Sequence, residues 1–430
     1  MSNLVPEGWS LRNLGSTLDV LIAGQSPNRK EFSARLGAYG ILKTTAIDWG
    51  RFYPQHNQEV LDDFKPNLKH EVAVDDILIT KAGPAHRVGV VAHVKSTPSK
   101  ILVSGKMTLM RVKQGYVSSF IAYALSTEYS QKPLKESTTG MASSQTNFTH
   151  DTLKEIPIVV PNSKNEQKKI AAILTSVDDV IEKTQAQIDK LKELKTGMMQ
   201  ELLTSGVGVD GKPHTEFKDS PVGPIPKGWE VAKLDEVAVI QTGAAKSSKL
   251  TGDLVELPYL RVANVQDGYL DLSEIKTIKV PKSKSERFLL RENDVLVNEG
   301  GDFDKLGRGS IWSGQISPCA HQNHVFVVRT NTNKLNPNFF NHLSGSEHGK
   351  KYYMGCAKQT TNLASINSSQ LKQFPVLLPS LEEQVVICQV LNSIDENISK
   401  KQAKLAQNRD LKKALMQDLL TGKVRVKVED

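Results

Sequence analysis

The chain has 430 residues, with 55 Lys and Arg against 47 Asp and Glu and a formal net charge of +8, a basic excess that permits nucleic-acid binding without establishing it. This length predicts two or three domains, and a composition of 39% hydrophobic and 24% charged residues excludes a disordered chain. Because the sequence has no run of about 18 apolar residues, no export signal at its start and only three cysteines, we expect a cytoplasmic protein without a membrane span or a disulfide framework.

Residues 1–152 form the first variable block, which we predict to be an α+β domain. Short apolar and β-branched runs predict strands at 77–80 and 88–94, and a helical stretch lies near 117–127. A block of roughly 150 residues is large enough to bury its own core.

Residues 153–204 form the first repeated region, in which a long helix follows a proline-rich lead-in. Pro157 and Pro161 cannot continue a helix, so they predict an extended segment before it. The apolar residues at heptad spacing are Ile170, Val177, Leu191 and Met198 in one frame, and Leu174, Ile181, Ile188 and Leu202 in the other. The residues expected to widen this apolar stripe are Ile173, Val180 and Leu194. The spacing predicts an amphipathic helix of about 38 residues, roughly 55 Å long.

Residues 205–224 form a linker that is rich in Gly, Pro, Ser and charged residues. Gly206, Gly211 and Lys212 have the spacing of a phosphate-binding loop, but Pro213 stands where the Mg²⁺-binding Ser or Thr belongs. No strand is predicted before this segment and no helix after it. We therefore interpret it as a connection between domains.

Residues 225–370 and 371–430 repeat the same organisation. The second variable block predicts strands at 295–298 and 325–328 and a helical stretch near 338–353. Its repeated region has the same proline lead-in before a second long helix. The apolar residues of that helix at heptad spacing are Ile387, Ile394 and Leu415 in one frame, and Leu391, Ile398, Leu405 and Leu419 in the other.

The two halves are copies of one unit of about 218 residues. Residues 166–203 and 383–420 are identical at 16 of 38 positions. Weaker matches pair Pro6–Trp9 with Pro226–Trp229, Lys43 with Arg261, and Asp76 with Asp294. Polar residues interrupt or weaken both stripes at Thr184, Lys195, Lys401 and Lys412. Because one chain has two such helices, the simplest partner for each is the other.

Two motifs resemble parts of catalytic sites without completing them. Residues 336–340, Asn-Pro-Asn-Phe-Phe, are similar to the Asn-Pro-Pro-Tyr loop of amino-methyltransferases, but they lack its second proline and a Gly-rich cofactor loop. We interpret them as a helix N-cap and turn. Asp75-Asp76 before Lys81, and Asp294 before Glu299, do not complete a nuclease set, so we interpret them as carboxylates at strand edges.

A third group, Cys319, His321 and His324, offers three soft ligands without a fourth, which favours a structural or DNA-facing polar loop and leaves the question of a metal open. No nucleophile–base arrangement and no zinc-protease spacing was found. The absence of a catalytic constellation favours a binding subunit over an enzyme.

The chain as a whole resembles the specificity (S) subunit of type I restriction–modification enzymes. The resemblance rests on the twofold pattern of proline lead-in, Glu166-Gln167 or Glu383-Gln384, the Asp178 or Asp395 region and a long terminal helix. It implies two α/β target recognition domains in a pseudo-twofold arrangement, separated by two long helices that form an antiparallel coiled coil. In that family each domain reads half of a bipartite DNA site, and the helices act as a ruler for the unread spacer.

The resemblance also implies partners and cofactors. Two methyltransferase subunits are expected to dock and to methylate adenine N6 with S-adenosylmethionine, and restriction subunits add ATP- and Mg²⁺-dependent translocation and cleavage. The specificity subunit itself is expected to be non-catalytic and to hold no cofactor or metal. The rival hypotheses are a coiled-coil scaffold without sequence-specific DNA binding, and a nucleic-acid enzyme whose motifs are unrecognised.

Specific reading needs cations for phosphates and Arg, Lys, Asn or Gln for base edges. The candidate DNA contacts in the first domain are Lys43, Lys81, Arg87 and Gln145. Those in the second domain are Lys246, Arg261, Asn264, Arg308, Lys358, Gln359 and Asn362. Lys43 and Arg261 are the best pair, because they occupy matching positions in the repeat.

Overall fold

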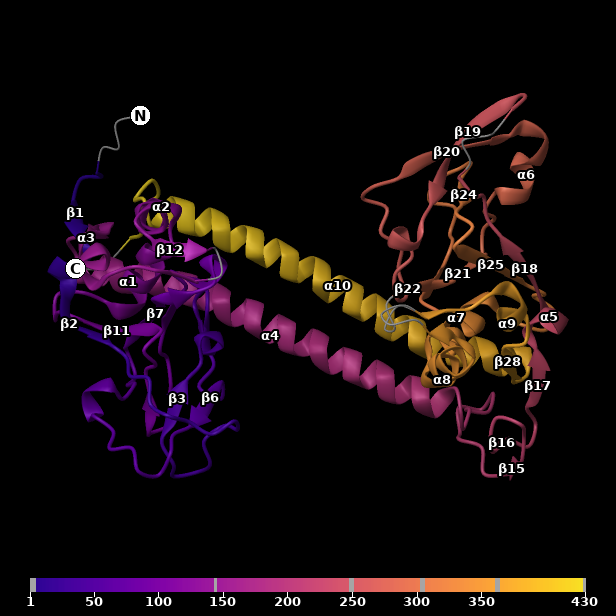
Figure 1. Cartoon of the computed structure of the whole chain (residues 1–430), viewed down its shortest axis with the longest axis horizontal. Coiled ribbons are helices and arrows are strands. Elements are labelled where there is room, and N and C mark those ends of the chain that lie inside the picture. Colours follow the sequence, from indigo (N-terminus) through magenta and orange to yellow (C-terminus); the bar gives the residue numbers. More distant parts are fainter. Residues whose placement is uncertain (1–4, 143–144, 247–250, 302–305, 360–363, 428–430) are drawn as a thin grey trace. The chain divides into compact units, whose positions relative to one another are not determined.

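The structure is a computed structural model of the chain, and it describes residues 5–142, 145–246, 251–301, 306–359 and 364–427. Two compact units divide the chain: Met1–Ala186 together with Gln402–Asp430, and Gln187–Lys401 (Figure 1). Both unit boundaries fall inside the two long helices, α4 (Lys164–Leu202) and α10 (Leu381–Leu419). Each unit therefore contains part of both helices.

The first unit is organised around an antiparallel sheet with the strand order β2-β11-β7-β9. Its strands are β2 (Leu18–Ala23), β11 (Met107–Val112), β7 (Ile77–Thr80) and β9 (Val91–His93). Ile77 and Ile79 of β7 enter the core on one face and Leu78 enters the core on the other, because side chains alternate along a strand. Burial on both faces explains the continuous apolar run, and the strand predicted at 77–80 is confirmed.

Smaller sheets and helices surround this sheet. The other strand groups are β1 (Trp9–Asn13) with β14 (Pro157–Pro161), β10 (Ile101–Leu102) with β3 (Gly40–Leu42) and β6 (Asn57–Glu59), β12 (Thr139–Ala142) with β13 (Gln145–Asn147) and β8 (Ala82–Gly83), and β4 (Ile47–Asp48) with β5 (Arg51–Phe52). The helices besides α4 and α10 are α1 (Ser118–Leu125), α2 (Glu128–Glu136) and α3 (His150–Glu155), with 3-10 turns η1 (Leu14–Thr17), η2 (Thr44–Ala46), η3 (Leu68–His70) and η4 (Ala85–Arg87). Strand β14 is the extended lead-in that the prolines predicted.

The second unit has a sheet of the same order, β18-β25-β21-β23. Its strands are β18 (Ala238–Thr242), β25 (Val325–Thr330), β21 (Val295–Asn298) and β23 (Gly309–Ile311). The other strand groups are β17 (Glu230–Lys233) with β28 (Pro375–Leu378), β20 (Lys276–Pro281) with β19 (Leu254–Leu260) and β24 (Ala320–His321), β22 (Gly300–Gly301) with β27 (Ala364–Ser365) and β26 (Lys358–Gln359), and β15 (Phe217–Lys218) with β16 (Ile225–Pro226). The helices besides α10 are α5 (Leu234–Val237), α6 (Ser285–Phe288), α7 (Pro337–Gly345), α8 (Glu347–Cys356) and α9 (Ser368–Lys372), with 3-10 turns η5 (Val262–Asn264) and η6 (Lys282–Lys284).

The two units share topology and register. Leu78 pairs with Leu109 in the first sheet, and the residues at the equivalent positions of the repeat, Leu296 and Val327, pair in the second. The one helical stretch predicted at 338–353 is two helices, because Ser346 has an extended conformation and caps α8. The duplication read from the sequence is therefore a duplication of the fold.

A buried ion pair is repeated in the two central sheets. Asp76 accepts a 2.7 Å hydrogen bond from Arg111 Nε, and Asp294 accepts one of the same length from Arg329 Nε. Both carboxylates are buried, so each needs this partner to offset the loss of hydration. Asp76 and Asp294 lie next to strands as predicted, whereas their arginine partners were not predicted.

The repeated Glu-Gln pair connects each long helix to its surroundings. Gln167 accepts a hydrogen bond from Val117 N, and Gln384 accepts one from Asn336 N, just before α1 and α7 respectively. The amide nitrogens donate to proline carbonyls of the lead-in, at 2.9 Å from Gln167 to Pro161 and at 3.0 Å from Gln384 to Pro379. Each glutamine thus fixes the start of one shorter helix against the long one.

The linker at 205–224 is ordered by contacts with the second long helix. Glu383 is buried and accepts hydrogen bonds from Trp229 Nε1 at 3.0 Å and from Val207 N at 3.1 Å. His214 adds a third contact, with its Nε2 2.8 Å from Glu383 Oε1. Gly206 has φ +68° and lies against Trp229, so a side chain there would collide with the indole. The linker predicted from composition is therefore packed onto the second unit.

The long helices were predicted at about the right place and length, and each spans 39 residues. Within the first unit Lys412 pairs with Asp178, and Arg425 beyond α10 pairs with Glu166, so the two chain segments run antiparallel. Within the second unit Lys195 pairs with Asp395 and Lys401 hydrogen-bonds to Gln187. The helices therefore pack antiparallel in each unit, which agrees with the predicted fold class.

The apolar stripe of α4 is narrower than predicted. Ile170, Leu174, Ile181 and Ile188 are buried. Val180 is 44% exposed and Leu194 50% exposed, so the prediction that these two widen the stripe is wrong. A single partner helix covers only a narrow seam, which leaves the flanking positions in solvent. In the part of the chain that is described, no helix is both long and apolar enough to cross a membrane.

Candidate functional site

The fold places Lys43 and Arg261 at the same point of the repeat, as the sequence predicted. Lys43 follows β3 and directly precedes the turn η2, whereas Arg261 follows β19 and directly precedes η5. We call the segments 43–53 and 261–271 the matched loops. Each begins with a short 3-10 turn, followed by an antiparallel β-pairing at equivalent positions, Ile47 with Phe52 and Val265 with Leu270. Apart from the glycine at 50 and 268, their residues differ.

Each matched loop turns at a glycine that is fixed to the central sheet. Gly50 has φ +74° and Gly268 has φ +80°, a region that glycine adopts without strain. Gly50 N donates to Val91 O at 2.9 Å, and Gly268 N donates to Gly309 O at 2.9 Å. The same anchor therefore holds both turns while the neighbouring side chains are free to vary.

An aromatic side chain flanks each of these glycines and is partly exposed. Trp49 precedes Gly50 and is 39% exposed, and Tyr269 follows Gly268 and is 60% exposed. Exposed aromatic rings on a fixed turn provide stacking surfaces for bases or for partner side chains. Trp49 and Tyr269 were not among the predicted contacts, although the glycines beside them repeat at the same offset as Lys43 and Arg261.

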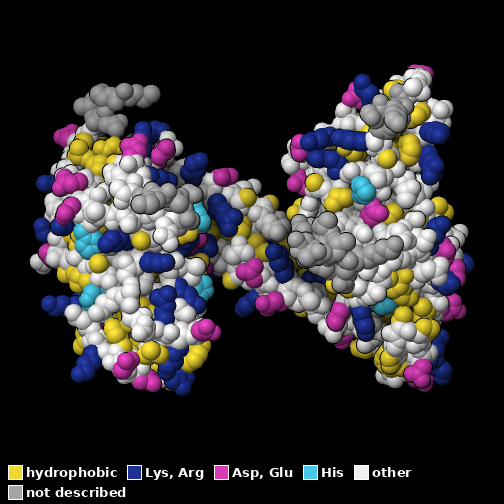
Figure 2. All heavy atoms as spheres, in the orientation of Figure 1, with side chains coloured by type: hydrophobic (Ala, Val, Ile, Leu, Met, Phe, Trp, Pro, Cys, Tyr) yellow, Lys and Arg dark blue, Asp and Glu magenta, His cyan; other side chains and the backbone are white. Residues whose placement is uncertain are grey.

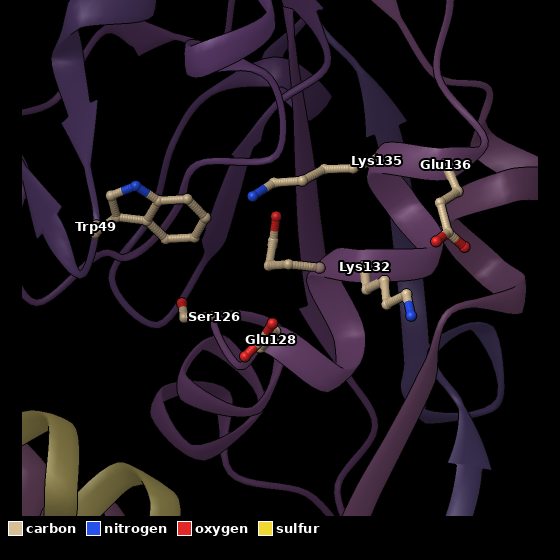
Figure 3. Close-up of a pocket in the computed structure, with 7 residues that line it drawn as sticks. Trp49, Ser126, Glu128, Lys132, Lys135 and Glu136 are labelled. Atoms are coloured by element: carbon tan, nitrogen blue, oxygen red, sulfur yellow. The ribbon is translucent and has the colours of Figure 1, made fainter.

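The matched loop of the first unit borders a hollow of about 530 Å³ that opens to solvent. Its lining residues are Trp49, Ser126, Glu128, Gln131, Lys132, Lys135 and Glu136. In Figure 3 the Lys135 side chain extends from α2 toward the indole of Trp49. Two lysines and two glutamates line the hollow, so their charges cancel. The net charge of the lining therefore does not favour binding of an anion.

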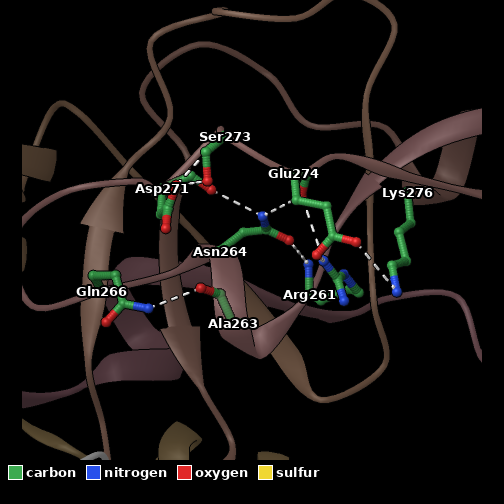
Figure 4. Close-up of polar contacts among 8 residues, drawn as sticks. All are labelled: Arg261, Ala263, Asn264, Gln266, Asp271, Ser273, Glu274 and Lys276. Carbon is green, nitrogen blue, oxygen red and sulfur yellow. Dashed lines mark hydrogen bonds and ion pairs between the residues drawn. The ribbon is translucent and has the colours of Figure 1, made fainter. Parts of the chain in front are cut away.

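The matched loop of the second unit is tied together by a polar network (Figure 4). Arg261 Nη2 lies 3.0 Å from Glu274 Oε2, and Lys276 lies 3.4 Å from the other oxygen of that carboxylate. Hydrogen bonds from Arg261 and from Lys276 lower the pKa of Glu274, so the carboxylate is ionised at neutral pH. The guanidinium of Arg261 is therefore already oriented by an internal partner.

Asn264, another predicted contact, supports this network from inside. The residue is 3% exposed, and its amide nitrogen donates to Asp271 O at 2.8 Å and to Glu274 O at 3.0 Å. Its carbonyl oxygen accepts from Arg261 N at 2.9 Å. Asn264 thus closes the 261–274 segment into one hydrogen-bonded loop.

The other predicted contacts lie in different surroundings. Lys43, Gln145 and Lys246 are exposed, and Lys81 is half-buried beside β8. Arg308 Nη1 lies 3.3 Å from Gln266 Oε1, and Arg87 donates to carbonyls of the first matched loop. Lys358 and Gln359 form β26, and Asn362 lies outside the described residues. Contact with DNA stays a prediction for all of these positions.

The segments that resembled other sites have structural roles. Asn336 caps α7 by accepting hydrogen bonds from Asn338 N and Phe339 N, which confirms the predicted N-cap. Gly208 N donates to Lys212 O and Gly211 N donates to Gly208 O, which makes the linker segment a tight turn. The element that follows this turn is the strand β15 and not a helix, in agreement with the rejection of a phosphate-binding loop.

The side chains of Cys319, His321 and His324 each interact with a different protein group. His321 Nδ1 lies 2.7 Å from Val325 O, and His324 pairs with Glu299. Burial raises the pKa of the Cys319 thiol to about 12, so it is not a thiolate. Among the described residues, no group of three or more His, Cys, Asp or Glu side chains is placed to hold a metal ion.

Comparison with known proteins identifies the family. A family model described as the type I restriction modification DNA specificity domain matches the chain twice, over residues 6–193 and 226–407. The putative type I restriction enzyme MjaX specificity subunit of Methanocaldococcus jannaschii is 27% identical over 98% of this chain and 95% of its own length. The MjaVIII specificity subunit of the same organism is 29% identical over 98% of this chain and 94% of its own length.

Two solved structures share the fold at low sequence identity. The S subunit of a type I restriction–modification system from M. genitalium has a TM-score of 0.61 at 15% identity, and the match covers 98% of this chain and 97% of that one. A chain from a structure of type I restriction–modification complex assembly and conformational transition has a TM-score of 0.53 at 17% identity, with 98% and 100% coverage. Both support the duplicated fold.

Proposed function

The chain belongs to the family of type I restriction–modification DNA specificity subunits, and on this premise we propose that it reads a bipartite double-stranded DNA site, one half-site with each unit. The observation that carries the proposal is the pair of matched loops. They keep one backbone and one glycine anchor, and they differ in side chains from Lys43 or Arg261 onward. A shared scaffold with divergent side chains suits two readers of different sequences.

The chemistry of the loops fits contact with DNA. Lys43 is an exposed cation that can pair with a phosphate, and Arg261 carries the planar fork that suits a guanine edge or a phosphate. On the face drawn in Figure 2, Lys and Arg side chains are scattered among acidic ones over each unit. Because the net charge of +8 is small for 430 residues, the placement of individual cations matters more than overall attraction.

The residues proposed as DNA contacts are those predicted from the sequence: Lys43, Lys81, Arg87, Gln145, Lys246, Arg261, Asn264, Arg308, Lys358, Gln359 and Asn362. Exposure favours Lys43, Gln145 and Lys246 among them. Burial of Asn264 and the internal partners of Arg87 favour supporting roles for these two.

We further propose that the chain has no active site of its own and acts in the cytoplasm through partner subunits. Two N6-adenine methyltransferase subunits would dock on the two similar repeated regions and supply S-adenosylmethionine. Restriction subunits would supply ATP- and Mg²⁺-dependent translocation and cleavage. Two related copies of one region on one chain suit two copies of one partner, because each copy can offer the residues that the repeat retains. The helices α4 and α10 would set the length of the unread spacer.

Selection from randomised DNA tests the proposal. The full chain with its methyltransferase partner and S-adenosylmethionine would be mixed with duplexes that carry two randomised segments at several separations. Molecules protected from a nuclease that is blocked by N6-methyladenine would then be sequenced. We expect two defined half-sites at one separation.

Two outcomes would contradict parts of the proposal. Protected molecules without a shared motif would favour the scaffold hypothesis, in which the coiled coil only holds partners together. Methylation by this chain in the absence of the partner would overturn its non-catalytic role.

A further inference from the structure

The carbonyls of the matched loops are bound at the same two places in both units. In the first unit Arg87 Nη2 donates to Thr44 O at 2.9 Å and to Ile47 O. In the second unit a single Asn298 Nδ2 donates to Val262 O and Val265 O, at 3.4 and 2.9 Å. Val262 and Val265 are the repeat equivalents of Thr44 and Ile47, so the bound carbonyls correspond.

These bonds bring an external donor to carbonyls inside the loops, one of which, Val262 O, also accepts a hydrogen bond from Val265 N at 3.3 Å within its own turn. A 3-10 turn of three residues leaves carbonyls without partners inside it, and buried carbonyls without partners are costly. Ile47 and Val265 are buried, at 0% and 1% exposure, so water is a poor substitute for the donor. One external donor therefore holds each loop in its conformation.

The two donors do not occupy the same position in the repeat. Asn298 ends β21, and the residue that corresponds to it in the first unit is Thr80 at the end of β7. The Thr80 hydroxyl donates to the backbone carbonyl of Arg87. In the first unit, Thr80 at the end of the strand bonds to Arg87, and Arg87 bonds to the loop. In the second unit, Asn298 at the end of the strand bonds to the loop directly.

The guanidinium group of Arg87 interacts with groups of the matched loop. Its Nη1 lies 3.4 Å from Asp48 Oδ1 in the same loop, and its side chain is 23% exposed. Asn298 is 1% exposed. Both donors therefore face the loops and present little of themselves to an outside ligand.

We propose that Arg87 and Asn298 are positioning residues for DNA reading, each fixing the matched loop of its own unit so that its exposed side chains, Lys43 and Trp49 in the first unit and Tyr269 in the second, are presented to the half-site. The inference rests on the proposed function. It reassigns Arg87 from direct contact to support, and it adds Asn298, which the sequence did not single out. Because the donor can come from either of two different positions in the repeat, each loop can vary without losing its anchor.

Base preference at each half-site tests the inference, because each substitution leaves the other unit as an internal control. Arg87→Ala should lower selectivity about tenfold within one half-site and leave the other unchanged, since losing about 1.4 kcal/mol of discrimination corresponds to that factor. Asn298→Ala should do the same in the opposite half-site. Arg87→Lys keeps a donor and should restore part of the preference, whereas Asn298→Asp keeps the shape, loses the donor and should not.

Controls separate positioning from general stability. Thr17→Val and Tyr353→Phe each remove one buried hydroxyl hydrogen bond, to Leu14 O and to Ser344, without touching a matched loop. They should lower the unfolding temperature but keep both preferences. If Arg87→Ala does not fold, Arg87→Lys and Asn298→Ala still decide the question.

Unchanged preference in the Arg87 and Asn298 variants would overturn the inference, and so would equal loss in both half-sites or equal loss in the controls. A wild-type chain without any base preference would instead overturn the proposed function. The two failures are therefore distinguishable in one selection experiment.

Discussion

Lys412 Nζ lies 2.7 Å from Oδ1 of Asp178, and this ion pair joins α10 to α4 within the first unit. The other carboxylate oxygen of Asp178 accepts a 2.7 Å hydrogen bond from the Tyr123 hydroxyl. The repeat places Lys195 and Asp395 in the same relation within the second unit, also at 2.7 Å. The lysines that interrupt the apolar stripes are therefore paired with the aspartates that recur beside them, and the pairs specify which residues of the helices face each other.

Breaking the first pair should destabilise the first unit. Lys412→Met leaves Asp178, 10% exposed at its side chain, without its cationic partner and should cost about 2 kcal/mol of unfolding free energy. The double variant Asp178→Lys with Lys412→Asp should recover about half of this loss, because opposite charges face each other again. Scanning calorimetry of the full chain measures both effects. A double variant that is less stable than Lys412→Met would argue against pairing as the cause.

Lengthening both helices should change the spacer and not the half-sites. Seven residues added to α4 and to α10 preserve the heptad stripe and lengthen each helix by about 10 Å, which corresponds to roughly three base pairs of DNA. The selected half-sites should stay the same at the larger separation. Insertion of the same seven residues into the linker, after Gly211, is the matched control and should leave the spacer unchanged. Altered half-site sequences would contradict the ruler hypothesis.

The stability of the second unit should depend on pH through His321. Burial lowers the pKa of His321 to about 4, so between that pH and the usual 6.5 the unfolded chain binds a proton that the folded chain does not. Neutral His321 therefore contributes up to about 3 kcal/mol to the free energy of unfolding. This contribution is complete above pH 6.5 and is lost as the pH falls toward 4. His321→Asn keeps a donor for Val325 O and should flatten this dependence in denaturant titrations. Parallel curves for the two proteins would contradict the assignment.

Lys43 should contribute to DNA affinity through a phosphate. Lys43→Ala should weaken binding about threefold to tenfold and reduce the slope of log affinity against log salt by about one, since one fewer counterion is released. Lys154→Ala removes another cation of the same unit, one that pairs with Asp151 at 3.2 Å, and should leave the slope unchanged. Fluorescence anisotropy at several salt concentrations measures both. An equal change in the two variants would indicate only a general charge effect.

The sequence by itself determined the features that depend on periodicity and repetition. Heptad spacing located both long helices to within a few residues, because the amphipathic pattern reflects burial along one side of a helix. The nearly constant offset between the two halves, 218 residues from Lys43 to Arg261 and 217 from Glu166 to Glu383, identified the duplicated fold. Prolines at 157 and 161 predicted the extended lead-in, because proline cannot continue a helix.

Tertiary structure alone decided which polar groups meet. In the sequence, Lys195 and Lys412 only interrupt an apolar stripe. In the structure, each forms an ion pair with an aspartate of the other long helix. Arg87 was predicted to contact DNA, yet in the structure it donates into the matched loop, and Asn298 does the same from another position. Partners that lie dozens or hundreds of residues apart leave no local pattern, because hydrogen bonds and ion pairs depend on distance in space and not on spacing along the chain.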